Sequence, residues 1–147
     1  MRVLDTASRR RMLGLLAATA LTAALSAAWW QAVGRWSMPL YCIQQRGTVW
    51  GGLFETPAGL TPVCPTASTY RTEVRTGQSR VEQYTLPTWA PDALLTPLTR
   101  AGYVLREDEI RGPGHYSAFL GRTVPAELFY TAVRDGSGTL ITISGSP

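Results

Sequence analysis

The apolar and polar residues divide the chain into a long uncharged stretch and a later region of short, regular patterns. Residues 12–34 contain no charged side chain, and most of them are apolar. An α-helix rises about 1.5 Å per residue, so a helix of this length crosses a hydrocarbon core of about 30 Å. The first pattern therefore predicts an N-terminal hydrophobic helix.

Residues 69–76 alternate, with Tyr70 and Val74 on one face and charged side chains on the other. This alternation is typical of a half-buried strand. Gly77 and Gln78 suit a two-residue turn that leads into a second strand of a hairpin. The polar face of the hairpin would then be a solvated sheet face that carries Glu73, Arg75, Arg80 and Glu82.

Residues 91–102 predict one short helix. Pro91 suits the first helical position, Gly102 suits the C-terminal cap, and an apolar stripe runs between them. Pro97 conflicts with a helix that starts at Pro91, because it removes a hydrogen bond, and it predicts a bend. Further strands are predicted at residues 48–54, 103–107, 116–120, 127–133 and 139–144.

Together these elements predict an α+β fold: a mostly antiparallel sheet with one short helix on one face, preceded by the N-terminal signal or transmembrane helix. The domain boundaries follow the change in composition. We expect residues 1–36 to form an export signal or signal-anchor, residues 37–67 a Gly/Pro-rich segment with a disulfide, and residues 68–147 a small α+β domain.

The positive charge belongs mainly to the N-terminal segment. The chain has 14 basic and 10 acidic side chains, a net charge of +4, and residues 1–28 hold four arginines against one aspartate, a net +3. The remainder carries only +1 and forms no basic stripe of the kind that binds phosphates. This distribution argues against a nucleic-acid partner.

The residues before the apolar run point to export. Ser8-Arg9-Arg10-Arg11-Met12-Leu13 resembles a twin-arginine export signal, with Arg9 and Arg10 as the arginine pair and Met12 where a Phe is usual. Basic residues before an apolar helix place the N-terminus in the cytoplasm.

The sequence leaves open whether the apolar helix is retained or removed. Small residues at 26–28 suit cleavage near Trp29, which would give a secreted or periplasmic protein. The length of the run and the tryptophans at positions 29, 30 and 36 favour an anchor with an interfacial aromatic belt. We expect a retained anchor through residues 12–34, with the folded domain on the outer side of the cytoplasmic membrane.

Cys42 and Cys64 are the only two cysteines, and both follow the export segment. An even number of cysteines in an exported chain predicts one disulfide. A metal pair or a catalytic thiol is the alternative, but neither cysteine has a histidine or a further cysteine beside it. The disulfide is the firmest site prediction.

The sequence offers no catalytic, cofactor-binding or metal-binding set. His115 is the only histidine, and no nucleophile pattern or ligand spacing accompanies it. Connecting loops often carry function, so Arg111, His115 and Tyr116 are a candidate binding tip. Trp50 and Trp89 are expected to pack in the core or against loops.

These observations favour a non-enzymatic, membrane-tethered interaction or accessory subunit of a cell-envelope complex, whose partners are the membrane and another envelope protein. One alternative is a small exported ligand-binding domain, which a concave apolar pocket would favour. A second alternative is a small hydrolase whose carboxylates, distant in sequence, meet in space.

Overall fold

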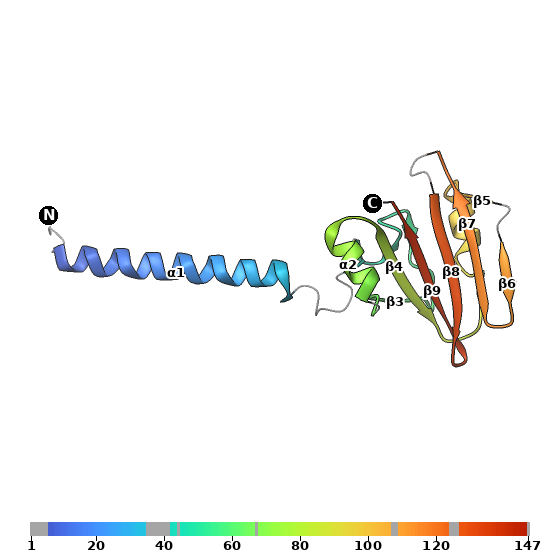
Figure 1. The fold of residues 1–147 in the computed structure, drawn as a ribbon, viewed down its shortest axis with the longest axis horizontal. Helices are drawn as coiled ribbons and strands as arrows, with labels where there is room; N and C mark the ends of the chain where they lie inside the picture. Colours follow the sequence, from blue (N-terminus) through green and yellow to red (C-terminus); the bar gives the residue numbers. More distant parts are fainter. Residues whose placement is uncertain are drawn as a thin grey trace. The chain divides into compact units, whose positions relative to one another are not determined.

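The structure is a computed structural model, and it describes residues 6–34, 42–43, 45–66, 68–106, 109–123 and 127–146. The chain separates into two compact units, residues 1–38 and residues 39–147. The first unit contains one long helix, and the second contains a β-sheet with short helices (Figure 1). The predicted α+β fold is confirmed.

The long helix, α1 (Thr6–Ala32), confirms the predicted N-terminal apolar helix. Residues Arg11–Ala32 are long and apolar enough to span a membrane, with a mean hydropathy of 1.7. The helix is apolar on all sides rather than along one stripe, and its leucines from Leu13 to Leu25 are exposed. A helix of this kind is typical of a signal sequence or a membrane span and not of an amphipathic surface helix.

The main sheet has seven strands, all paired antiparallel, in the order β3-β4-β9-β8-β7-β5, with β6 also paired to β7. Its strands are β3 (Thr61–Val63), β4 (Arg80–Leu86), β5 (Val104–Leu105), β6 (Ile110–Gly112), β7 (His115–Gly121), β8 (Glu127–Asp135) and β9 (Gly138–Gly145). Figure 1 shows β4, β9, β8 and β7 side by side as the long central strands.

The predicted strands at residues 116–120, 127–133 and 139–144 are confirmed as β7, β8 and β9, each slightly longer than expected. The strand expected at residues 103–107 shortens to β5. The strand expected at residues 48–54 is wrong as one element: β1 (Thr48–Val49) and β2 (Phe54–Glu55) form a separate two-stranded hairpin. The short edge strands β3 and β6 were not predicted.

The strand predicted at residues 69–76 is wrong, because this segment is the helix α2 (Ser68–Thr76). Tyr70, Glu73 and Val74 are its half-buried residues, and their spacing of three and four fits a helical face. Gly77 ends the helix at φ 70°. The Gly77 amide donates to the Val74 carbonyl and the Gln78 amide to the Glu73 carbonyl, at 3.2 and 2.9 Å, which is a Schellman cap.

The hairpin register expected around Gly77 is therefore also wrong. The strand β4 pairs with β3 and β9 and not with residues 69–76. Glu82 was expected on a solvated face, but it lies on the face of β4 that points into the core, and it is completely buried.

The predicted helix at residues 91–102 is shorter than expected, because α3 runs over Leu95–Arg100. Residues 91–94 form turns, in which the Leu95 amide donates to the Asp92 carbonyl at 3.0 Å. Pro97 thus falls in the first turn of α3, where backbone amides have no partner within the helix. The conflict at Pro97 disappears, and no bend is needed.

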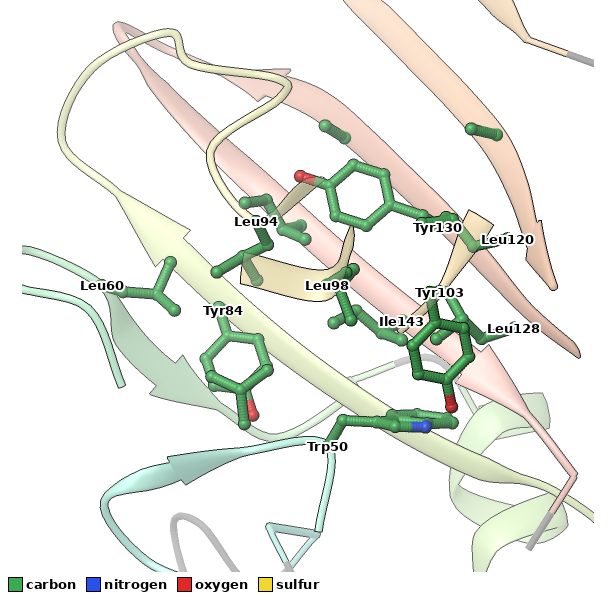
Figure 2. Packing of buried hydrophobic residues seen from close by; sticks show 14 of the residues in the cluster. Trp50, Leu60, Tyr84, Leu94, Leu98, Tyr103, Leu120, Leu128, Tyr130 and Ile143 are labelled. Carbon is green, nitrogen blue, oxygen red and sulfur yellow. The ribbon is translucent and has the colours of Figure 1, made fainter. Parts of the chain in front are cut away.

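One face of the sheet carries the hydrophobic core. Alternate residues of β7, β8, β9 and β4 point into it, and α3 with the 49–60 segment covers it. Figure 2 shows Leu94 and Leu98 of the α3 region beside Tyr130, and Trp50 beneath Tyr84 and Tyr103. Trp50 therefore packs in the core, as predicted. The Tyr130 hydroxyl donates to the Pro91 carbonyl at 2.7 Å, which ties β8 to the start of the α3 region.

Candidate functional site

The predicted disulfide between Cys42 and Cys64 is confirmed, with a Cα–Cα distance of 5.6 Å. It links the start of the 42–64 segment to the end of β3. Within this segment Val49, Trp50 and Leu60 are buried in the core of the sheet domain. The disulfide therefore closes a loop whose interior residues cover one end of the core.

The arginine pair Arg9 and Arg10 lies in the N-terminal part of α1. This position precedes the apolar stretch that starts after Arg11. The structure thus puts the basic residues and the apolar residues on one continuous helix, as an export signal or an anchor has them.

The structure brings together two of the three tip residues, Arg111 and Tyr116. They face each other across β6 and β7, and the Arg111 guanidinium lies 4.8 Å from the Tyr116 ring centre. Arg111 also forms an ion pair with Glu109 at 2.8 Å. His115 is exposed, and its side chain belongs to the opposite face of the strand from Tyr116.

The charges at this tip are paired with each other. Arg111 holds the pKa of the Glu109 carboxyl below its usual range. Burial first, and then the negative charge of Glu109, raises the pKa of Tyr116 to about 12. The Arg111 cation is thus already engaged by a carboxylate and a ring, and this makes the tip a poor anion site.

Sequence reasoning missed the environment of Glu82. Its carboxylate accepts hydrogen bonds from the backbone amides of Trp50 and Gly51, the latter at 3.0 Å, and from the Tyr84 hydroxyl at 2.6 Å. The Arg80 guanidinium lies 3.8 Å away. Trp50 and Gly51 have φ values of 53° and 64°, and successive amides in such a turn form a concavity that binds anions.

Glu82 fills this concavity with a carboxylate of the protein itself. The arrangement fixes the 50–51 turn to β4 and holds the Trp50 ring against the core. Burial and the neighbouring Glu82 charge both raise the pKa of Tyr84, so its hydroxyl keeps its proton and donates. No sequence signal marked this role, because the alternating charges around Glu82 look like a solvated strand.

Sequence reasoning also missed the second face of the sheet, which we call the open face. It carries the side chains that alternate with the core residues, among them Ser117, Phe119, Phe129, Thr131 and Val133. Phe119 and Val133 are 41% and 43% exposed. Large apolar side chains on the central strands of a sheet are usually covered by other parts of the domain, and these two are not.

A groove lies where α2 meets this open face. Tyr70 and Glu73 of α2 line one side, and Phe119, Glu127 and Phe129 of the sheet line the other, around a volume of about 380 Å³. We call it the α2 groove. The rings of Phe119 and Phe129 form a pair across β7 and β8, with their centres 4.6 Å apart. The groove therefore has aromatic walls and two carboxylates.

Both carboxylates lack a cationic partner in the described part of the chain. The two ion pairs between described residues involve neither Glu73 nor Glu127. The Ser79 hydroxyl donates to one oxygen of Glu73 at 2.8 Å. No described residue that lines the groove is an arginine or a histidine, so its lining contains two carboxylates and no basic side chain.

A scan against protein-family models and searches of curated proteins and solved structures found no match to this chain. Among the described residues, no group of three or more His, Cys, Asp or Glu side chains is placed to hold a metal ion. The α2 groove is therefore the candidate functional site on its own geometry.

Proposed function

We propose that the protein is a membrane-tethered, non-enzymatic interaction or accessory subunit of a cell-envelope complex. Its sheet domain lies on the outer side of the cytoplasmic membrane. The observation that carries the proposal is the combination, in one short chain, of an apolar helix and a disulfide-linked domain with exposed apolar side chains on one sheet face.

The N-terminal helix supports the tether. A helix that is apolar on all sides is stable in lipid, where every backbone group is satisfied within the helix. Arg9 and Arg10 precede it, and the positive-inside rule keeps such residues in the cytoplasm. Trp29 and Trp30 at the other end are 60% and 44% exposed, and tryptophans are typical of the membrane–water interface.

The disulfide supports the outer location, because disulfides persist in oxidising compartments and are rare in the cytosol. With the N-terminus in the cytoplasm, a single span delivers residues 39–147 to the outer side. The same topology would place the partner in or on the envelope.

The open face and the α2 groove support an interaction role. Exposed apolar side chains gathered on one surface are typical of protein contacts. Phe119, Val133 and Ile110 all belong to this face, and Ile110 is 63% exposed. A tethered domain that acts by binding a partner protein needs such a surface and does not need catalytic residues.

The groove volume also favours a second candidate, a small exported ligand-binding domain. Small-molecule sites have volumes of about 300–1,000 Å³, and the α2 groove, at about 380 Å³, falls within this range. A free ligand would bind to the isolated protein without any partner chain.

Native-gel migration of the tagged full chain, extracted from its own membranes in mild detergent, tests the proposal. We expect the chain to migrate within a complex larger than the single protein. A variant with residues 1–36 replaced by a cleavable signal should be exported and lose that migration. A full chain that migrates alone would overturn the proposed function.

A further inference from the structure

The α2 groove combines aromatic surface and negative charge. Phe119 and Phe129 form a ring pair, and Tyr70 of α2 lines the same groove. The faces of aromatic rings attract cations, arginine more often than lysine. Glu73 and Glu127 add two carboxylates to the same lining.

The carboxylates remain available to an outside cation. Glu127 is exposed and begins β8. Ser79 engages one oxygen of Glu73, which leaves acceptor capacity on the other oxygen. One cation lies near Glu127: the Arg106 guanidinium lies against Gly121, which is the cross-strand neighbour of Glu127. Arg106 forms no ion pair with Glu127 in the described part of the chain.

The open face also carries exposed apolar side chains outside the groove. Ile110 and Val133 are exposed and lie on the same face as Phe119 and Phe129, with the Ser117–Thr131 pair between them. We call these four apolar side chains the apolar row. A free cation would fill only the groove, whereas an extended polypeptide would also cover this apolar row. The occupant that fits the whole surface is therefore a protein segment with a basic side chain.

We propose that the α2 groove receives an arginine or lysine of an extended segment of the partner protein. The cation lies against Phe119 and Phe129 and within reach of Glu73 and Glu127, while the rest of the segment covers the apolar row. This inference rests on the proposed function, since it names the chemistry of the partner at the contact.

In-cell photocross-linking of the full chain tests this proposal. The photoreactive residue p-benzoylphenylalanine replaces Gln78, which is exposed and lines the groove but belongs to neither the aromatic pair nor the carboxylates. A second version carries it at His115, which is exposed at the predicted tip. The cross-linked peptide of the partner is then identified by mass spectrometry.

We expect position 78 to cross-link to a protein segment that carries an arginine or lysine next to the linked residue. The double variant Glu73→Gln and Glu127→Gln should lower the cross-link yield about tenfold, as expected for two partly exposed charge pairs. The matched control Glu55→Gln removes an exposed carboxylate outside the groove and should leave the yield unchanged.

Several outcomes would overturn the groove proposal. The first is a cross-linked segment that has no basic residue, and the second is a cross-link yield that the double variant does not lower. The other two are a lipid as the cross-linked product and the absence of any cross-link at position 78. In each of these cases a protein link at position 115, or the larger complex on the native gel, would leave the proposed function standing. No protein link at either position, with a chain that migrates alone, would reject both.

Discussion

At the scale of single residues, the carboxylate of Glu82 holds the 50–51 turn against the sheet. Two backbone amides and one hydroxyl donate to it within the core. Hydrogen bonds to a charged group are stronger than those between neutral groups. A buried carboxylate is costly without partners, but here each of its oxygens is satisfied.

We expect the substitution Glu82→Gln to lower the free energy of unfolding by about 3 kcal/mol. The amide keeps the shape, but its NH₂ group would face donors, so at least one buried donor loses its acceptor. Denaturant unfolding monitored by tryptophan fluorescence measures this change. The control Glu55→Gln should shift stability by less than about 0.5 kcal/mol, and an equal, small effect of both would contradict the role of Glu82.

The buried tyrosines predict a loss of stability at alkaline pH. Burial raises the pKa of Tyr84 and of Tyr130 above the ordinary value of 10.0. Above pH 10 the unfolded chain releases these protons and the folded chain retains them. The unfolded state then binds fewer protons, so stability falls as pH rises, by up to about 1.4 kcal/mol per pH unit for each tyrosine.

The composition of the chain leaves few other side chains that change protonation in this pH range. The chain has no lysine, both cysteines are in the disulfide, and arginine stays protonated. Denaturant unfolding at pH 8.5 and pH 11 should show the decline, and Tyr130→Phe should make it shallower. Equal stability at both pH values would contradict the account of the core.

At the scale of elements, α2 is defined by its C-terminal cap. Gly77 adopts a φ of 70°, and an added Cβ at this position would meet no other atom within 4 Å. The cost of a side chain there is therefore purely one of backbone conformation.

We expect Gly77→Ala to lower the free energy of unfolding by about 1 kcal/mol and to shorten α2 at its C-terminal end. Amide hydrogen exchange of residues 72–76 measures the local effect. The control Gly114→Ala has no positive φ and meets only an ordinary contact at 3.5 Å, so it should leave α2 unchanged. Protection of α2 that is unaltered by Gly77→Ala would argue against the cap.

The same residues show how far the sequence predicts the elements. The strands β7, β8 and β9 were predictable, because each alternates and is bounded by turn residues. The α2 segment satisfies both periodicities, since Tyr70 pairs with Val74 in either one. Gly77 suits a hairpin turn as well as a helix cap, and only the tertiary contacts of α2 with β4 decide between them.

The candidate site was less predictable than the fold. The α2 groove joins Glu73, which was assigned to a strand, with Phe119 and Glu127, which lie far along the chain. Local sequence patterns do not predict which residues of distant elements lie close together in space. The disulfide was predictable because composition alone limits the chain to one pairing.

At the scale of the whole molecule, the disulfide closes a loop with a sequence separation of 22. The chain-entropy model gives a loop of this size about 3 kcal/mol. We expect the double substitution Cys42→Ser and Cys64→Ser to lower the free energy of unfolding by this amount, measured in denaturant. A double variant as stable as the parent would show that the core contacts of Val49 and Trp50 suffice without the disulfide.

Under the proposed function, the fate of the helix α1 decides where the sheet domain acts. Retained, it confines the open face to the membrane surface, where a membrane partner meets it at high effective concentration. Removed, it leaves a free domain of the kind that the ligand-binding alternative describes.

The intact mass of the protein, taken from the membrane and the soluble fractions of its own cells with and without reductant, tests this account most directly. We expect the full-length mass in the membrane fraction, with a gain of two hydrogen atoms on reduction. A soluble species that begins near Trp29 would contradict the tether and bring the ligand-binding alternative forward. A mass that reductant does not change would contradict the disulfide in either fraction.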